Sequence, residues 1–577
     1  MIGRVRAASF RRSPTRLGRR RQCHAGRPAL LALLCLPFAA TAGAAAPAPA
    51  EVAAYAERVM REAVPDPDGP GLAVLVARGE EVLYRGARGR ASIELGVALS
   101  PDHVMRIGSV TKQFAAAALL KLVDEGRAAL DDPLAKYLPD YPNAQAITLH
   151  QLLDHTAGIA NYTDLPGYMD GPIRRDLTTA ELVTVFANEK PMFAPGQRWA
   201  YSNSGYVLVG AVIEAITGKR WHAYLGEAVL EPAGLAHTRY GADTAVIDGF
   251  ADGYSLTGGP VSRAAAISMT QPHAAGALVS TLDDLWRWNL ALHRGHVLSQ
   301  ASYTRMITPT GAAAKADTPY GYGIARGTLR GRPTLSHDGG IPGFLSKLTW
   351  LPEQQLTVVS LRNADGAPVP PAERRIAAFA LGDPYPDPTP VAVDADALRA
   401  LEGVYRKDAR DSRVLRVVDG ALTSQREGGR PYRLIAVAGD RFVFEGSLSH
   451  LEPVRDRRGR VTGLVFHPEG EAGERWQRSG DLPPGRVAIE LPRAALERLV
   501  GDYASPQLTI KVFLDEAGVL HAQVPGQPAF ALKAESAERL FIAEVDATLT
   551  FDAGSAPAAR VTLKQGPAEI PLERRRP

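Results

Sequence analysis

The chain has 577 residues, too many for one ordinary hydrophobic core, so its length predicts about two to four domains. Its hydrophobic fraction of 45% and charged fraction of 22% are typical of globular proteins and exclude a largely disordered chain. Nine arginines within residues 1–28 account for the formal net charge of +4. The other 57 basic and 62 acidic residues leave the rest of the chain slightly acidic, which gives no electrostatic reason to expect nucleic acid as a partner.

The N-terminal residues 1–44 have the pattern of a secretory signal peptide. The arginines precede an uncharged apolar stretch from Ala29 to Ala40, and small residues follow, with Ala42-Gly43-Ala44 as the expected cleavage site. The apolar stretch is shorter than the ~20 residues that a membrane-spanning helix needs, and Pro37 interrupts it, although a membrane anchor is the alternative. We therefore expect a periplasmic or secreted protein without a transmembrane span after signal removal.

Both cysteines, Cys23 and Cys35, lie within this leader. The rest of the chain therefore has no disulfide, no cysteine nucleophile and no thiolate metal site. No His-Glu-x-x-His or comparable ligand motif occurs in the sequence, so we expect neither a metal nor another cofactor.

Residues 45–382 have the pattern of a mixed domain of helices and short strands. The apolar spacing predicts strands at 71–76, 82–84, 344–351 and 356–361 and a helix at 110–125. The last two strands flank a short polar turn and predict a hairpin, and Gly126 ends the helix. Together these elements indicate an α+β (mixed α/β) domain with a central antiparallel sheet.

The remainder of the chain consists of two related modules after a proline-rich linker at 383–395. The modules, at 396–480 and 487–577, contain segments that recur at offsets of 98 to 100 residues. Short apolar segments separated by Gly and Asp predict that each module is a small all-β barrel or sandwich. We expect Pro483-Pro484-Gly485 to join them, and the modules either to cap the first domain or to mediate oligomerisation.

Ser109 and Lys112 lie three residues apart at the start of the predicted helix, so they share one helix face. A serine is a weak nucleophile unless a neighbour removes its proton. A lysine can do so when burial or nearby positive potential, such as a helix N-terminus, lowers its pKa from ~10.4 towards neutral. The alternative is an N-cap serine beside a solvated lysine, although no other lysine here has a serine three residues before it.

Two further motifs carry groups suited to acyl transfer. Tyr201-Ser202-Asn203 combines a phenol that can transfer a proton with an amide that can hold a substrate carbonyl, although Tyr141-Pro142-Asn143 has the same spacing. Ser336-His337-Asp338-Gly339-Gly340 lies just before the predicted hairpin, and its glycines would let a substrate approach a strand edge. A histidine in such a position is either catalytic or structural.

The three motifs, in this order, resemble those of the serine β-lactamase and penicillin-binding-protein superfamily. The resemblance is greatest to the branch of class C β-lactamases, D,D-carboxypeptidases, D-aminopeptidases and related esterases, and it covers roughly residues 50–380. Further matching segments are Met105-Arg106-Ile107-Gly108, Leu130-Asp131-Asp132-Pro133, Leu152 to Gly158, Phe193-Ala194-Pro195-Gly196, Gly276 to Thr281 and Tyr320-Gly321-Tyr322-Gly323. It implies a β-lactamase-like fold for the first domain.

The resemblance also implies the catalytic roles. Ser109 would attack a carbonyl and form an acyl-enzyme, Lys112 would be the general base, and Tyr201 would transfer protons during acylation and deacylation. His337 would be the catalytic residue of the third motif. No metal is required for this chemistry.

The substrate-binding roles follow from the same resemblance. Asn203 would orient the substrate amide. The backbone N–H groups of Ser109 and Gly340 would form the oxyanion hole, and Gly339 would belong to the substrate-binding backbone. The two C-terminal modules resemble the β-barrels that follow the catalytic domain in D-aminopeptidase-like relatives.

The third motif departs from the family pattern. Most relatives that bind a substrate carboxylate have Lys-Thr-Gly where this chain has His337-Asp338-Gly339, and a carboxylate at Asp338 would repel such a substrate if it faced the cleft. We therefore expect a D-stereospecific, aminopeptidase-like peptidase or an esterase that acts on a small peptide, amide or ester. The alternatives are a β-lactamase or D,D-carboxypeptidase, and a slow-turnover penicillin-binding-like sensor or binding protein.

Overall fold

The structure, a computed structural model, describes residues 47–575 apart from 258, 367–370, 388, 410, 483–485, 506–507, 526, 553–556 and 567. The predicted signal peptide with its two cysteines, and the Pro-Pro-Gly segment at 483–485, lie outside the described residues. In the described part of the chain, none of the helices is long and apolar enough to span a bilayer.

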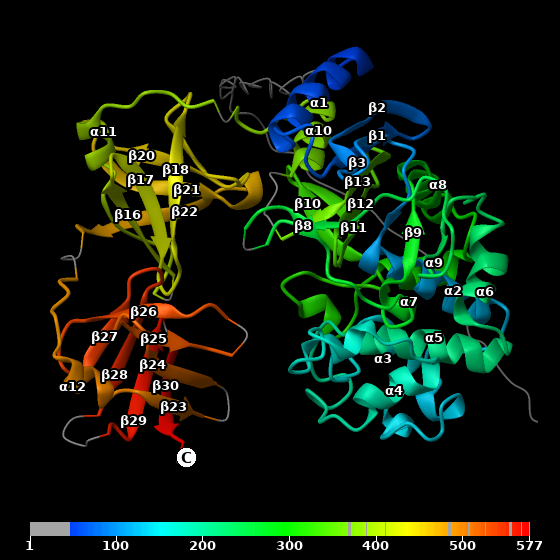
Figure 1. Ribbon diagram of the computed structural model, residues 1–577. Helices are drawn as coiled ribbons and strands as arrows, with labels where there is room; N and C mark the ends of the chain where they lie inside the picture. Colours follow the sequence, from blue (N-terminus) through cyan, green and yellow to red (C-terminus); the bar gives the residue numbers. More distant parts are fainter. Residues whose placement is uncertain are drawn as a thin grey trace, which may run out of the picture. The chain divides into compact units, whose positions relative to one another are not determined.

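A six-stranded antiparallel sheet is the centre of the first domain (Figure 1). Its order is β10-β11-β12-β13-β1-β2, so strands from the start of the domain pair with a hairpin from its end. The strands are β1 (Leu72–Arg78), β2 (Glu81–Arg88), β10 (Ala325–Leu329), β11 (Arg332–Ile341), β12 (Phe344–Leu351) and β13 (Leu356–Arg362). The four predicted strands are all found in this sheet, and the predicted fold class is confirmed.

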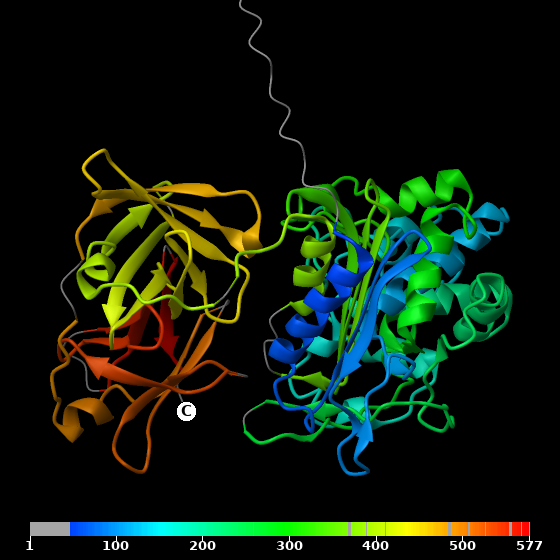
Figure 2. The same ribbon diagram turned by 90° about the horizontal axis from the view of Figure 1, so that it is seen from above.

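Helices cover both faces of this sheet (Figure 2). Alternate residues of β1 enter two different cores, with Val74 packed beside α1 (Pro49–Ala63) and α10 (Ala372–Ala380) and Leu75 facing the larger helical layer. That layer contains α2 (Thr111–Asp124), α5 (Asn203–Thr217) and α8 (Leu282–His293). Burial on both faces explains why β1 is an almost continuous apolar run instead of an alternating one.

Shorter elements complete the domain. The remaining helices are α3 (Leu149–Leu153), α4 (Thr179–Ala187), α6 (Trp221–Leu225), α7 (His273–Gly276) and α9 (Gln300–Ile307). Small sheets join β3 (Arg90–Ser92) with β4 (Val97–Ala98), β5 (Met105–Arg106) with β9 (Leu278–Ser280) and β6 (Arg239–Tyr240), and β14 (Ala364–Asp365) with β7 (Tyr254–Ser255) and β8 (Ser262–Arg263). The predicted helix at 110–125 is α2.

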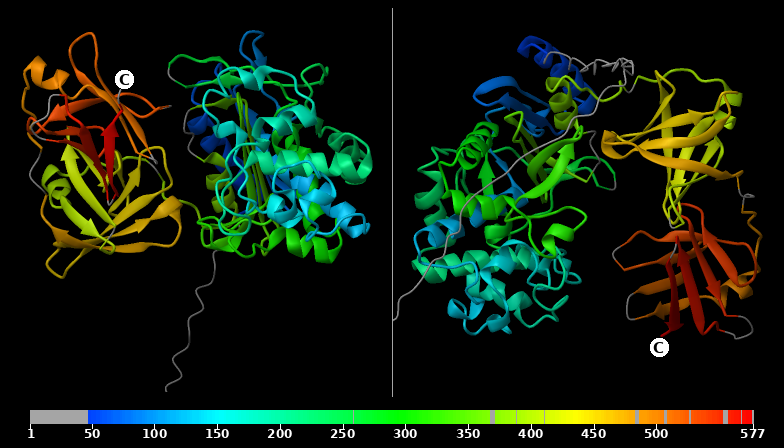
Figure 3. Two further views of the ribbon diagram at one scale, coloured as in Figure 1. Left: turned by 90° about the horizontal axis from the view of Figure 1, so that it is seen from below. Right: turned by 180° about the vertical axis from the view of Figure 1, so that it is seen from behind.

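The C-terminal modules are two closed eight-stranded antiparallel barrels (Figure 3). The first consists of β15 (Gly403–Arg406), β16 (Ser412–Val418), β17 (Ala421–Arg426), β18 (Pro431–Val437), β19 (Arg441–Phe444), β20 (His450–Arg455), β21 (Val461–His467) and β22 (Glu474–Gly480). The second consists of β23 (Gly501–Ala504), β24 (Thr509–Leu514), β25 (Leu520–Gln523), β26 (Phe530–Ala534), β27 (Arg539–Ile542), β28 (Ala547–Phe551), β29 (Arg560–Gln565) and β30 (Ala568–Arg574). A short helix precedes each barrel, α11 (Ala395–Arg399) and α12 (Arg493–Glu497).

A repeated hydrogen bond explains the repeated sequence. The first strand of each barrel carries a fully buried tyrosine, Tyr405 or Tyr503. The phenol of Tyr405 donates to Leu401 O at 2.7 Å, and that of Tyr503 donates to Leu499 O at 2.9 Å. Because a buried hydroxyl needs a partner, the leucine-to-tyrosine spacing is the same in both copies.

In the first domain, β11 passes so close to the turn before α2 that a side chain would not fit between them. A Cβ atom on Gly339 would lie 2.1 Å from Ile107 O and 2.2 Å from Ser346 Oγ. Gly108, at a φ of +46°, would place its Cβ 3.0 Å from Gly340 N. Gly339 is therefore required by the approach of the protein's own backbone, whatever the substrate.

We predict that Gly339→Ala lowers the free energy of unfolding by about 1–3 kcal/mol, because its Cβ would overlap a fixed carbonyl oxygen. Thermal unfolding followed by circular dichroism measures the loss. Gly340→Ala is the matched control, because a Cβ there would meet only Leu345 Cδ2, at 3.7 Å. Equal stability of the two variants would contradict the tight packing of β11 against the turn.

Candidate active site

The serine–lysine pair predicted from the sequence is in contact. Ser109 lies in a short 3-10 turn (Gly108–Val110) that runs directly into α2, and Lys112 is the second residue of that helix. Lys112 is fully buried, and its Nζ lies 3.1 Å from Ser109 Oγ. The three-residue spacing therefore brings the amine to the hydroxyl, although Ser109 itself precedes the α-helix.

Two oxygen atoms from distant segments also contact the lysine amine. Lys112 Nζ donates to Asn203 Oδ1 at 2.8 Å and to Ala275 O, in α7, at 2.8 Å. All three hydrogen-bond partners of the amine are uncharged groups. Burial accordingly lowers the pKa of Lys112 well below its ordinary value.

An N-cap serine positions the second motif. Ser202 Oγ accepts from Gly205 N at 3.3 Å and so begins α5, as serine commonly does at a helix start. Tyr201 and Asn203 flank this cap and are thereby held at the helix end. The Asn203 amide donates to Thr163 Oγ1 at 3.2 Å while its carbonyl accepts from Lys112, so both ends of the side chain are held by the protein.

The phenol of Tyr201 lies beside the nucleophile. The Lys112 amine lies 4.7 Å from the centre of its ring. Burial raises the pKa of Tyr201 far above its ordinary value, and a hydrogen bond with Ser109 opposes that rise. The phenol is therefore protonated at neutral pH. Tyr141, of the alternative motif with equal spacing, packs instead near Phe186, with ring centres 6.4 Å apart.

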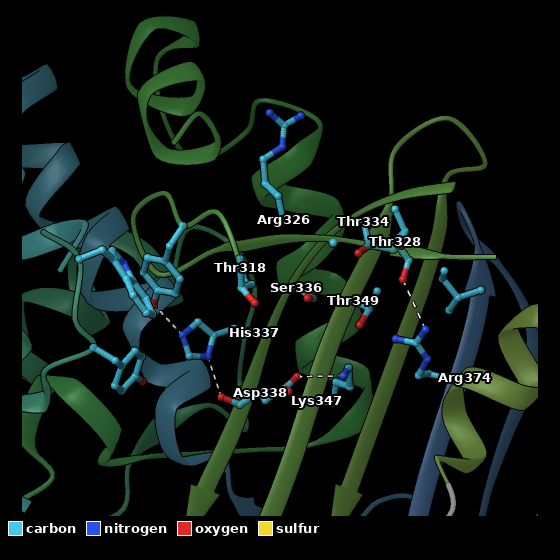
Figure 4. Close-up of a pocket in the computed structure, with 16 residues that line it drawn as sticks. Thr318, Arg326, Thr328, Thr334, Ser336, His337, Asp338, Lys347, Thr349 and Arg374 are labelled. Atoms are coloured by element: carbon cyan, nitrogen blue, oxygen red, sulfur yellow. Dashed lines mark hydrogen bonds and ion pairs between the residues drawn. The ribbon is translucent and has the colours of Figure 1, made fainter. Parts of the chain in front are cut away.

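His337 is a buried, neutral histidine. Its Nδ1 lies 2.6 Å from Asp338 O, which can only accept, so Nδ1 carries the proton. Its Nε2 lies 2.7 Å from the hydroxyl of Tyr320 and accepts a hydrogen bond from it (Figure 4). Burial lowers the pKa of His337 to about 4. Both ring nitrogens of His337 are therefore hydrogen-bonded within the protein. Tyr201 lies closer to Ser109 than His337 does, because the Tyr201 phenol is in contact with Ser109.

Three groups of the site were not assigned a role from the sequence. They are Tyr320, which holds His337, the carbonyl of Ala275, which holds Lys112, and His155, whose ring lies 4.4 Å from that of Tyr201. Tyr320 and His155 occur in segments that carried the family resemblance, and that was the available signal. A backbone carbonyl such as that of Ala275 leaves no sequence signal.

The edge of β11 is open beside these groups. β10 pairs with residues 332–336 only, so the edge from His337 onward is free of that neighbour. A cavity of about 500 Å³ lies here, lined by residues of the first domain that include Tyr201, Tyr320 and His337 (Figure 4). Gly340 lies farther along the same strand, against the Gly108 turn. The arrangement can accept an extended substrate along a strand edge.

Asp338 lines this cavity and is paired. Its Oδ1 lies 3.2 Å from Lys347 Nζ, on the neighbouring strand β12, and its side chain is 71% exposed. Arg326 and Arg374 also line the cavity (Figure 4). An incoming carboxylate would therefore meet positive as well as negative charge.

Comparison with known proteins agrees with this geometry. The Beta-lactamase family model matches residues 56–382. The D-aminopeptidase of Gluconobacter oxydans (strain 621H) is 28% identical over 318 residues, which cover 55% of this chain and 60% of that protein. Esterase EstB of Burkholderia gladioli is 36% identical over 200 residues, which cover 32% of this chain and 51% of the esterase.

A similar solved structure is that of a D-stereospecific amidohydrolase from Streptomyces sp., at 29% identity and a TM-score of 0.51, covering 56% of this chain and 98% of that one. The chain spans less than two thirds of the length of both curated relatives. The family match, in contrast, extends from residue 56 to the end of the first domain at 382 and covers more than half of the chain. The chain therefore belongs to the Beta-lactamase family and is similar to penicillin-binding proteins, D-aminopeptidases and an esterase.

Proposed function

We propose that the protein is an exported hydrolase that acts through an acyl-enzyme on Ser109, as a D-stereospecific, aminopeptidase-like peptidase or as an esterase. The contact between the buried Lys112 amine and the Ser109 hydroxyl is the observation that carries this proposal. Export rests on the pattern of residues 1–44. The substrate class rests on the names of the relatives and on the charges beside the open edge of β11.

The hydrogen bonds of Lys112 support its role as general base. A neutral amine has two N–H donors and one lone pair. Ala275 O and Asn203 Oδ1 can only accept, so they take both donors. The lone pair is then left for the third partner, Ser109 Oγ at 3.1 Å, so that the hydroxyl can donate its proton to the neutral amine.

The reaction follows from this geometry. Ser109 Oγ forms a bond to the substrate carbonyl carbon while its proton passes to Lys112 Nζ. The N–H groups of Ser109 and Gly340 stabilise the oxyanion of the tetrahedral intermediate. The protonated phenol of Tyr201 gives a proton to the leaving nitrogen or oxygen and regains one from Lys112. A water molecule then repeats the sequence on the acyl-enzyme and releases the acid.

The relatives support a substrate with a D-configured residue next to the scissile bond. A D-aminopeptidase and a D-stereospecific amidohydrolase share the catalytic domain, and an esterase shares part of it. Esters and amides react by the same acyl transfer, so one site serves both. Asp338 disfavours substrates with a free carboxylate at this edge, and its pairing with Lys347 limits the size of the effect.

We predict that a fluorophosphonate adds one adduct to the wild-type protein and none to Ser109→Ala, as measured by intact-protein mass spectrometry. Hydrolysis of a p-nitrophenyl ester and of D-alanine p-nitroanilide should fall roughly 10³-fold or more in the variant, because only binding and the oxyanion hole remain. Ser262→Ala, an exposed serine on β8, is the control and should keep the adduct. An adduct of equal yield on Ser109→Ala would eliminate Ser109 as the nucleophile.

We predict that Lys112→Met removes a pH-dependent part of the stability. Folding lowers the pKa of Lys112, so between that value and about 10.4 the unfolded chain holds one more proton, and the free energy of unfolding rises with pH by up to about 1.4 kcal/mol per unit. The variant should lack this rise in denaturant titrations at several pH values. Lys121→Met, on the same helix but half-buried, is the control. An identical slope for wild type and Lys112→Met would mean that Lys112 is charged in the folded protein.

We predict that Asp338→Asn raises kcat/KM for a penicillin and for a D-Ala-D-Ala peptide by about 5-fold, the effect of roughly 1 kcal/mol for an exposed charge. The variant frees Lys347 to attract the substrate carboxylate. D-Alanine p-nitroanilide, which has no carboxylate, is the control substrate and should change less than about twofold. Efficient turnover of the penicillin or the peptide by the wild type would favour the β-lactamase or carboxypeptidase alternative.

A further inference from the structure

Two histidines and a glutamate converge on the first barrel, in the hairpin of β20 and β21. His450 and His467 are direct cross-strand partners, and their rings stack with centres 4.4 Å apart at an angle of 5°. Glu452 lies two residues beyond His450 and therefore on the same side of β20. Leu451, between them, points into the barrel core. All three polar side chains thus point away from the core of the barrel.

The hydrogen bonds of the histidines leave two lone pairs facing the carboxylate. His467 Nδ1 lies 3.0 Å from Glu471 O and His450 Nδ1 lies 3.4 Å from Leu448 O, and a carbonyl can only accept, so both Nδ1 atoms carry the proton. The Nε2 atom of His467 lies 3.8 Å from Glu452 Oε2, and that of His450 lies 3.9 Å from Glu452 Oε1.

One ring nitrogen of this cluster is left without a hydrogen-bond partner. His467 Nε2 is buried without a hydrogen bond in the described structure, and His450 is 4% exposed. Arg441 donates to Glu452 Oε1 at 2.8 Å and so satisfies one oxygen of the carboxylate, while Oε2 faces His467. A buried acceptor without a hydrogen-bond partner either binds a ligand or destabilises the folded protein.

The second barrel shows that the fold does not need this cluster. Its corresponding hairpin is β28 and β29, where Leu549 pairs with Leu563 as Leu451 pairs with Phe466 in the first barrel. When the two hairpins are aligned on these inward-facing pairs, the positions of His450, Glu452 and His467 are occupied in the second barrel by Thr548, Thr550 and Lys564. The same barrel architecture therefore forms without a histidine pair. Of the two barrels, the first has the cluster and the second does not.

We propose that His450, Glu452 and His467 bind one divalent transition-metal ion, and that zinc is the ion that fits this donor set best. Ligand atoms that share a zinc ion each lie about 2.0–2.2 Å from it and hence at most about 4 Å from one another. His467 Nε2 lies within this limit of Glu452 Oε2, at 3.8 Å, and His450 Nε2 lies within it of Glu452 Oε1, at 3.9 Å. One ligand atom from each of the three residues lies within 4.8 Å of the others, so the three side chains would have to move slightly closer together to share one ion.

The ion would act as a clamp in the barrel wall. It would join β20 to β21 where the two strands meet, with water in the remaining coordination position and Arg441 holding the carboxylate in place. It takes no part in the acyl transfer at Ser109, whose groups are a lysine, a phenol and backbone N–H groups. The site is therefore independent of the proposed hydrolase function.

Zinc binding to the untagged full chain tests the proposal. The protein is treated with a chelator, dialysed against zinc chloride, freed of unbound metal and analysed for metal content, and a chromophoric chelator measures the affinity by competition. We expect one zinc per chain and a higher midpoint of thermal unfolding when zinc is present. Cobalt(II) in place of zinc should produce visible absorption bands from nitrogen and oxygen ligands.

The triple variant His450→Thr/Glu452→Thr/His467→Lys copies the residues of the second barrel and should fold but bind no zinc. Glu452→Gln, which keeps the side-chain shape, should weaken binding at least by the roughly 10- to 100-fold that loss of an outer-shell partner costs. His521→Gln is the control, because His521 pairs with a single carboxylate, Asp515, in the second barrel. Circular dichroism without metal verifies folding of each variant.

Two results would overturn the proposal. The first is a wild-type protein that holds no stoichiometric zinc. The second is an equal zinc affinity in the wild type, in Glu452→Gln and in the triple variant. If the triple variant does not fold, Glu452→Gln and His467→Gln decide the matter, since each changes one ligand.

Discussion

The burial of one amine organises the catalytic domain. A lysine inside a protein costs several kcal/mol unless its polar atoms are satisfied, and here Ser109, Asn203 and Ala275 supply the three partners of Lys112. These partners belong to the turn before α2, the start of α5 and the short helix α7. Each of those segments must therefore keep its position for the amine to stay buried without a counter-ion.

That constraint extends to the sheet. The turn that carries Ser109 lies against β11, and there Gly108 and Gly339 allow two backbones to meet without a Cβ between them. The hydroxyl of Ser346, on β12, donates to Ile107 O at 2.8 Å and fastens the same turn to the sheet. The nucleophile is thus positioned by rigid elements on both sides, which is how precise reactive geometry is usually maintained.

The side chains around the amine keep it neutral. His155 and His337 are buried with lowered pKa values, and Tyr201 and Tyr320 are buried with raised ones, so all four are uncharged at neutral pH. A shell of neutral polar groups can orient hydrogen bonds without adding a negative charge that would hold the lysine proton. Such surroundings suit the role of general base that we propose for Lys112.

Local patterns in the sequence were sufficient for several conclusions. The three-residue spacing of Ser109 and Lys112, the apolar runs of the hairpin and the repeat that contains Tyr405 and Tyr503 all depend on neighbours within a few residues, and the structure contains the helix, the strands and both barrels. The closed form of the barrels, as opposed to sandwiches, depends on pairing of the first strand with the last.

Contacts between distant segments were decided only by the tertiary structure. Lys112 meets Asn203 and Ala275 across 91 and 163 residues, and its partner in α7 is a carbonyl that every residue type possesses. The need for Gly339 follows from Ile107, and His450 meets His467 only because β20 pairs with β21 in one register. The sequence by itself determined the family, the contact between Ser109 and Lys112 and the repeated modules, because periodicity and short motifs encode them. The tertiary structure decided which groups satisfy each buried polar atom, because that depends on strand register and close approach, which no local pattern records.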